Sequence, residues 1–239
     1  MFESEESNIG CHGPFTIKLD PFGDKTEPTE TERDQLKTLA LEYFGETDTN
    51  KSVAIQQFRK KLKTVDPSLL TDLPGQNGDD FLLRVLRAGT KTGQTFNIEN
   101  ATQLLLNFTS MMATVPRYFA PAWEEGHKSL RKGYAQQAHT MLTHRDRQGR
   151  RVYIWRPGFW NPDVVGFDTV FACGYALMEL IALEDKTQIA GVTSICDGSN
   201  FGYKQFKNFT FEDMKNAAKF GQVPAFIVLP LQTKILLKY

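Results

Sequence analysis

The sequence predicts an α/β protein in which a small helical bundle precedes an α/β domain. Two observations support this fold class. Up to about residue 112, apolar residues recur every three or four positions, which is the spacing of one face of a helix. From about residue 123, segments typical of strands alternate with helical segments, a pattern typical of a parallel sheet with crossover helices. With 41% apolar residues over 239 positions, the chain can bury a core.

The first part of the chain is expected to form helices that pack as a bundle, because short helices are not stable alone. Helices are predicted at about residues 31–45 and 49–63. Asp79 or Asp80 is expected to cap a third, short helix, and Asn97 to cap a fourth.

The second part is expected to contain both strands and helices. The predicted order is a helical stretch at 123–142, a turn at 146–149, a strand at 152–155, a helix at 167–184, a strand at 191–196 and a helix from Phe211 with Thr210 as its N-cap.

These patterns divide the chain into three regions. Residues 1–28 mix Gly, Pro, Ser and Glu without a period and are expected to form a mobile leader. Residues 30–112 are expected to form the helical unit, and residues 123–239 the α/β domain.

Composition narrows the class of partner and the compartment. The formal net charge is zero, so no global field recruits nucleic acid. The N-terminus lacks a secretory signal, and no apolar stretch is long enough to span a bilayer. The cysteines Cys11, Cys173 and Cys196 form no CxxC pair, which favours reduced thiols and a cytoplasmic location.

The sequence does not predict an enzyme. His127, His139 and His144 lack the spacing of a zinc site, and no nucleophile elbow or phosphate loop is present, so neither a metal nor a cofactor is expected. Cys196 at a strand end is either a nucleophile or a small apolar filler, and the filler interpretation is favoured.

Two motifs carry a resemblance to a known family. They are DDFLLRVLRA at residues 79–88 and DRQGRRVYIWRP at residues 146–157. In this order and at this separation they resemble the CRAL-TRIO family, which includes cellular retinaldehyde-binding and alpha-tocopherol transfer proteins. The resemblance covers about residues 50–222. It implies a non-catalytic cytosolic protein that binds and transfers a hydrophobic lipid, either a retinoid, a tocopherol or a phospholipid.

The resemblance also implies a ligand pocket between the sheet and the helices over it. Carried onto this sequence by position, the lipid-pocket residues are Phe167, Phe171, Gly174, Tyr175, Met178, Val192, Ser194 and Cys196. The helical members share one face, and the strand members alternate toward one side. Gly174 would leave space for a ligand or another backbone. The alternative, that this stripe only packs against the sheet, stays open.

Basic residues near the third helix help family members to engage phosphoinositide head groups. The matching candidates here are Arg84 and Arg87, with Gly89 at the third, often basic position. This implies transient membrane contact and recognition of phosphatidylinositol bisphosphate, although two arginines support only weak binding. A structural salt-bridge role for both arginines is the favoured alternative.

The sequence after Gln222 differs from the family pattern. Relatives continue into further strand and a gate helix, so the lipid-binding domain is expected to be incomplete at its C-terminus. The apolar run before Pro230 could add one strand. A second hypothesis follows: a truncated isoform that acts as a protein-interaction module without lipid binding, with a protein partner that the sequence does not identify.

Overall fold

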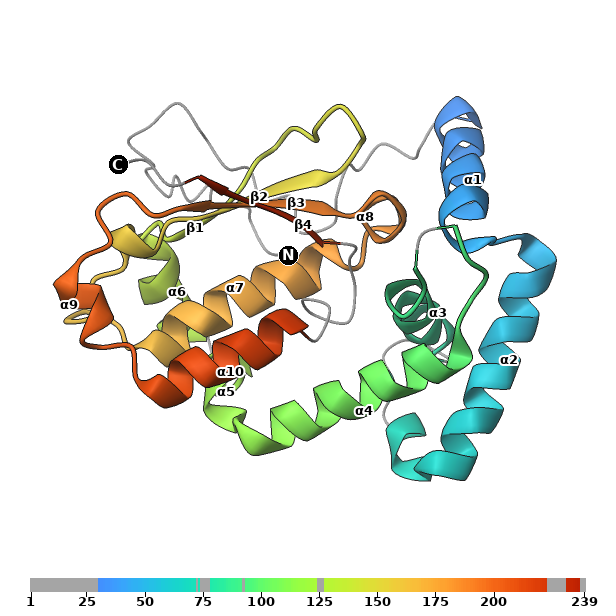
Figure 1. Cartoon of the computed structure of the whole chain (residues 1–239), viewed down its shortest axis with the longest axis horizontal. Coiled ribbons are helices and arrows are strands. Elements are labelled where there is room, and N and C mark those ends of the chain that lie inside the picture. Colours follow the sequence, from blue (N-terminus) through green and yellow to red (C-terminus); the bar gives the residue numbers. More distant parts are fainter. Residues whose placement is uncertain are drawn as a thin grey trace, which may run out of the picture.

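In the computed structural model of the chain, a group of helices lies at one end and a sheet with its own helices at the other (Figure 1). The structure describes residues 30–71, 73, 78–91, 93–123, 127–222 and 231–236. The expected leader at residues 1–28 lies outside the described residues. Among the described helices, none is long and apolar enough to cross a bilayer.

The N-terminal end consists of α1 (Glu30–Phe44), α2 (Asp48–Val65), η1 (Pro67–Leu70), α3 (Asp79–Ala88) and α4 (Ile98–Thr114). The helices share a core because their apolar faces meet: Phe58, Leu82 and Leu86 are fully buried. As predicted, Asn97 caps α4 by accepting a hydrogen bond from the Asn100 amide at 2.9 Å.

The predicted cap of α3 was wrong by one residue. The cap position is Gly78, whose φ of 67° lies in the left-handed region that favours glycine. Asp79 is the first residue of the helix, and no side-chain hydrogen bond caps this helix end. Its carboxylate instead forms an ion pair with Arg59, with Nη2 at 2.6 Å from Oδ1. An acidic side chain is also favourable in the first turn because the positive end of the helix dipole lies there.

The helical stretch predicted for residues 123–142 is also wrong. The chain forms η2 (Pro116–Tyr118), α5 (Ala120–Trp123), α6 (Lys128–Ala135) and then a strand, β1 (His139–Met141). Gln137 has a φ of 58°, which ends the helical path after α6. The next residues pair with a neighbouring strand, and Thr140 and Met141 become buried there.

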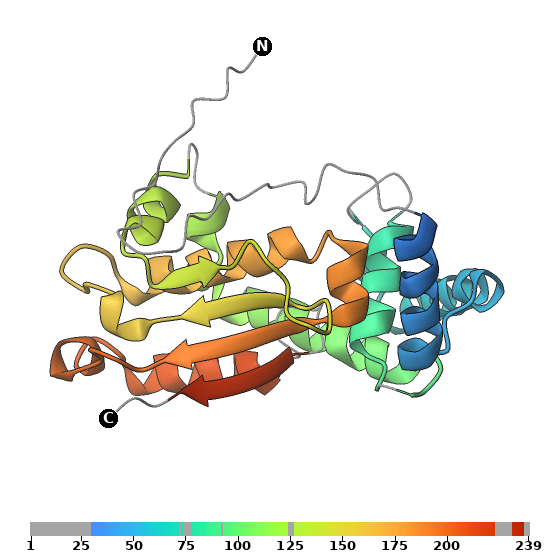
Figure 2. The same cartoon turned by 90° about the horizontal axis from the view of Figure 1, so that it is seen from above.

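The sheet contains β1, β2 (Arg151–Trp155), β3 (Val192–Asp197) and β4 (Leu231–Leu236), in that spatial order. β1 runs antiparallel to β2, whereas β2, β3 and β4 are parallel (Figure 2). The strand after Gln222 begins directly after Pro230. The apolar run at 223–230, expected to be that strand, lies outside the described residues.

The helices of this domain are α7 (Phe167–Ile181), α8 (Asp185–Ala190), α9 (Tyr203–Phe206) and α10 (Phe211–Gln222), with the short η4 (Pro157–Phe159) after β2. α7 and α10 run along one face of the sheet (Figure 1). The predicted helix at 167–184 ends three residues early, and the separate α8 was not predicted. Thr210 caps α10 as predicted, accepting from the Asp213 amide at 3.0 Å.

A single buried cluster connects the helical unit to the α/β domain. It extends from Phe58 on α2 through Phe108 on α4 and Phe119 to Tyr175 on α7. The Phe108 and Phe119 rings, and the Phe119 and Tyr175 rings, meet edge to face with centroids 6.4 and 4.9 Å apart. The α/β fold class is therefore confirmed. The domain boundaries at 30–112 and 123–239 stay predictions, because this cluster is continuous across both parts.

Candidate functional site

The sheet face toward α7 is set by the register of β2 and β3. Tyr153 lies opposite Ser194 and Trp155 lies opposite Cys196, so these four side chains share one face. Tyr153 identifies that face, because its hydroxyl would be only 3.3 Å from a Cβ added at Gly174 on α7. The predicted strand residues therefore point toward α7. Val192 is fully buried, whereas Ser194 and Cys196 are half-buried.

The predicted residues on α7 meet a pair of buried aromatic side chains, Tyr118 and Phe119. The Phe171 ring lies 4.7 Å from the Tyr118 ring, and the Tyr175 ring 4.9 Å from that of Phe119. Phe167 also contacts Tyr118, edge to face at 5.8 Å.

Burial separates these α7 residues into two groups. Phe167, Tyr175 and Met178 are buried in the main core, whereas Phe171 is half-buried and retains exposed ring surface. The stripe thus has a packing role, and among its aromatic residues Phe171 has the most surface left for a ligand.

Gly174 faces two side chains. A Cβ at this position would lie 3.0 Å from Cε1 of His139 and 3.3 Å from the hydroxyl of Tyr153. The space expected beside Gly174 is therefore occupied by these two residues on β1 and β2. Their close approach explains the need for glycine here, and a ligand contact at Gly174 stays a prediction.

His139 and Tyr153 form a buried polar pair that the sequence did not predict. Nδ1 of His139 lies 2.5 Å from the Tyr153 hydroxyl, and Nε2 lies 2.8 Å from the Val170 carbonyl oxygen. Burial lowers the pKa of His139 to about 4, outweighing the hydrogen bond to Val170. The ring is neutral at pH 7, so Nε2–H donates to Val170 and Nδ1 accepts from Tyr153. The sequence analysis assessed His139 only as a zinc ligand. The signal that was missed is the position of His139 on a strand, two residues before Met141, which is buried.

Trp155 supplies a buried donor on the same face of the sheet. Its indole Nε1 is buried and has no hydrogen-bond partner within the described ranges. A buried donor without an acceptor costs about 1–3 kcal/mol, so such a group is suited to an acceptor from outside the protein. Trp155 was not among the predicted pocket residues.

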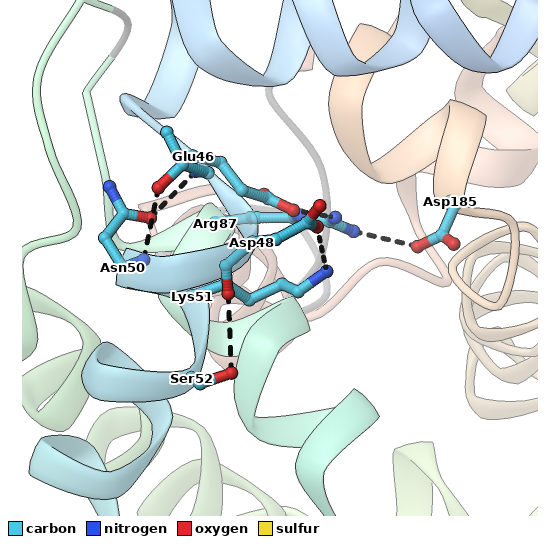
Figure 3. A network of polar contacts seen from close by, with 8 residues as sticks. Glu46, Asp48, Asn50, Lys51, Ser52, Arg87 and Asp185 are labelled. Carbon is cyan, nitrogen blue, oxygen red and sulfur yellow. Dashed lines mark hydrogen bonds and ion pairs between the residues drawn. The ribbon is translucent and has the colours of Figure 1, made fainter.

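Arg87, a predicted head-group residue, is 4% exposed and held by a polar network (Figure 3). Nε and Nη2 donate to the two carboxylate oxygens of Glu46 at 2.8 and 2.7 Å, and Nη1 donates to Asp185 and Gln188 at 2.9 and 2.6 Å. Burial lowers the pKa of Arg87, but the bonds to Glu46 and Asp185 outweigh it and the net shift is upward. These contacts give Arg87 a structural role.

Arg84, the second head-group candidate, is also buried. Its Nη2 lies 3.1 Å from Oε2 of Glu179 on α7, and the guanidinium lies 5.0 Å from the centre of the Phe81 ring. Arg84 lines a cavity of about 300 Å³ between α3 and α8. Its paired guanidinium favours the salt-bridge interpretation, and head-group binding by Arg84 and Arg87 stays a prediction.

A tight turn follows β3. Asp197 accepts a hydrogen bond from the Ser199 amide at 3.0 Å, and Asn200 adopts a left-handed conformation with a φ of 62°. Burial, with a further contribution from Asp197, raises the pKa of the Cys196 thiol. A protonated, half-buried thiol is a poor nucleophile, which supports the filler interpretation. Within the described ranges, no group of three or more His, Cys, Asp and Glu side chains could hold a metal ion.

The fold and this site define a class of protein: an α/β domain in which helices cover one face of a mixed sheet, with a largely aromatic interior that also holds the His139–Tyr153 pair and the Trp155 donor. Residues 135–224, which include β1 to β3 and α7 to α10, match the family model of the CRAL/TRIO domain. This match agrees with the family resemblance noted from the two motifs, and lipid binding and transfer is the function typical of that family. The hypothesis of an interaction module without lipid binding is not favoured by this match.

Proposed function

We propose that this protein binds a hydrophobic lipid between α7 and the sheet and transfers it within the cell, without catalysis. The supporting observation is the half-buried apolar surface that remains there. Phe171 on α7, and Ser194 and Cys196 on β3, belong to the enclosed face and retain exposed surface. Each methylene that a ligand buries against such surface contributes about 0.8 kcal/mol, so a long chain needs no charged contact.

The polarity of the site suggests which lipids fit. Trp155 offers one buried N–H donor that has no partner among the described residues. A ligand with an apolar body and one oxygen acceptor would satisfy this donor. Retinoids, tocopherols and phospholipids each combine an apolar body with at least one oxygen acceptor. The proposal includes a cytoplasmic location and only transient membrane contact.

The direct experiment is lipid extraction from the purified protein followed by mass spectrometry. A stoichiometric hydrophobic molecule with an oxygen acceptor is the expected result. Absence of any bound lipid, together with no saturable binding of fluorescent retinoid, tocopherol or phospholipid analogues to the folded protein, would contradict the proposal.

Neighbouring residues of β3 provide a matched pair of variants. Cys196→Trp adds bulk on the face toward α7, whereas Ile195→Trp adds the same bulk on the opposite face; both wild-type residues are half-buried. We expect Cys196→Trp to weaken ligand binding at least about tenfold, a loss of about 1.4 kcal/mol, and Ile195→Trp to leave it unchanged. Equal effects of the two variants would place the ligand elsewhere.

A further inference from the structure

A cavity of about 300 Å³ lies between the helical unit and the α/β domain and shares no lining residue with the proposed lipid site. It is here called the α3–α8 cleft, because α3 and α8 meet there (Figure 1). Its lining includes Asp80, Phe81, Leu83 and Arg84 on α3, and Leu183 and Asp185 where α8 begins. Pockets for small molecules begin at about this volume. One water molecule takes about 30 Å³, so the cleft has room for a solute of about ten non-hydrogen atoms.

Arg84 brings unused hydrogen-bond donors to the α3–α8 cleft. The residue is 7% exposed, and Nη2 is the one guanidinium nitrogen with a hydrogen bond among the described residues, to Oε2 of Glu179 at 3.1 Å. Nε is buried and has no acceptor there, and Oε1 of Glu179 is buried without a donor. Buried polar groups normally have partners, so this pair is suited to a ligand that supplies an acceptor.

Arg87 shows how fully a buried guanidinium on the same helix can be bonded. Its Nε and Nη2 donate to both carboxylate oxygens of Glu46, and its Nη1 donates to Asp185 and Gln188. Both arginines are buried beside α8, yet protein groups bond all three nitrogens of Arg87 and only one nitrogen of Arg84. The unused donors of Arg84 are therefore particular to the residue that lines the cleft.

Two carboxylates also line the cleft, and both are open to solvent. Asp80 is exposed, and the Asp185 side chain is 76% exposed. Glu179 already balances the charge of Arg84, so the two carboxylates leave the cleft with a negative charge. They would repel a simple anion such as phosphate, whereas a simple cation would leave the donors of Arg84 unused. A ligand that fits must carry both an acceptor and a positive charge.

The remaining lining offers apolar surface. Leu83 is buried, Phe81 is half-buried, and Leu183 is 71% exposed beside the carboxylates. A few placed polar groups among apolar walls are the usual composition of a small-molecule site. An apolar group of the ligand would cover the exposed Leu183 side chain and gain by removing it from water.

We propose that the α3–α8 cleft binds a free α-amino acid with an apolar side chain. The carboxylate accepts from Arg84, the ammonium group lies near Asp80 and Asp185, and the side chain packs against the apolar walls. This site is separate from the proposed lipid site and takes a water-soluble ligand. Because the cleft is lined by both the helical unit and the α/β domain, the ligand would contact both.

The test is isothermal titration calorimetry on the full chain with L-leucine and two analogues of the same side chain. The analogue 4-methylpentanoate lacks the ammonium group, and 3-methylbutylamine lacks the carboxylate. We expect leucine to bind one site with a dissociation constant of about 1 mM or lower, and each analogue to bind at least about tenfold more weakly. Equal binding of leucine and either analogue would overturn the proposal. So would the absence of saturable binding by leucine, isoleucine, valine, methionine and phenylalanine, which would leave only water in the cleft.

Neighbouring residues of α3 provide a matched pair of variants. Asp80 lines the cleft, whereas Asp79 is paired with Arg59; both are exposed, so neither substitution should unfold the chain. We expect Asp80→Asn to weaken leucine binding about fivefold or more, and Asp79→Asn to leave it unchanged. Equal effects of the two variants would contradict a site in this cleft.

A double variant tests Arg84 without leaving a buried charge unpaired. Arg84→Gln with Glu179→Gln removes both members of the ion pair and keeps polar side chains at both positions. Leucine binding should be lost while circular dichroism shows a folded chain. Leucine binding retained by this folded double variant would overturn the role of Arg84.

Discussion

Arg87 on α3 and Glu46, in the turn between α1 and α2, form a two-point ion pair in which both partners are nearly inaccessible. The side chains are 4% and 8% exposed, and two N–H groups face two carboxylate oxygens. Arg87 also reaches Asp185 and Gln188 on α8. One guanidinium thereby joins the helical unit to the α/β domain.

Removal of one partner from this pair should be strongly destabilising. We expect Arg87→Ala to lower the free energy of unfolding by about 3–5 kcal/mol, because Glu46 would remain buried and charged without a counterion. Urea denaturation measures the change. The control is Arg59→Ala, which removes an exposed pair with Asp79 and should cost less than about 1 kcal/mol. Similar losses in the two variants would contradict a structural role for Arg87.

The same burial limits phosphoinositide recognition. Arg87 is held at every guanidinium nitrogen, and Arg84 is buried with its Nη2 paired to Glu179, so a head group would have to reach buried groups and compete with these pairs. We expect the wild-type protein to bind vesicles containing phosphatidylinositol bisphosphate no more tightly than phosphatidylserine vesicles of equal surface charge. Flotation at physiological salt compares the two. Selective, near-stoichiometric recruitment by the bisphosphate lipid would show that at least one of these arginines is available to head groups.

Much of the fold followed from patterns that act over short distances. The periods of α2, α4 and α7 and the cap residues Asn97 and Thr210 are local features, and each was predicted close to its observed position. Alternation placed Val192, Ser194 and Cys196 on one side of β3, and the family resemblance assigned that side to the pocket. The ligand pocket itself was predicted only from the family resemblance, because the apolar residues on α7 could equally be explained by packing in the core.

The features that sequence reasoning missed depend on contacts between distant residues. β1 is a three-residue strand that exists because β2 pairs with it, and its sequence alone does not distinguish it from the end of α6. The unpaired Nε1 of Trp155 is visible only once the surrounding atoms are placed. Likewise, the burial of Arg87 arises because three separate segments converge on α3.

A Cβ at Gly174 should disturb the His139–Tyr153 pair. The added methyl would lie 3.0 Å from His139 Cε1, so the imidazole must shift and its two hydrogen bonds lengthen. We expect Gly174→Ala to cost about 1–3 kcal/mol despite the higher helix propensity of alanine. Gly93→Ala is a poor control because its φ is 81°, whereas Gly166 has open space around it and an ordinary φ. Thermal unfolding of Gly174→Ala and Gly166→Ala compares them, and equal stability would contradict close packing at Gly174.

His139 also makes stability depend on pH with a defined sign. Its pKa is about 4 in the folded protein, lowered by burial, and about 6.5 in the unfolded chain. Between these values the unfolded chain binds more protons, so acid favours unfolding. The stability that neutral His139 allows is present above about pH 6.5 and is lost as the pH falls toward about 4.

We therefore expect the wild type to lose about 2 kcal/mol more stability than His139→Gln between about pH 7.5 and pH 5. Glutamine keeps hydrogen-bonding capacity at this position but does not titrate, so the difference between the two curves isolates the imidazole. Carboxylates with lowered pKa values, such as Asp213 and Glu184, titrate mainly below this window and are common to both proteins. Urea denaturation at each pH gives the two free energies of unfolding. Parallel curves for the wild type and the variant would show that the His139 ring accepts a proton in the folded state as readily as in the unfolded chain.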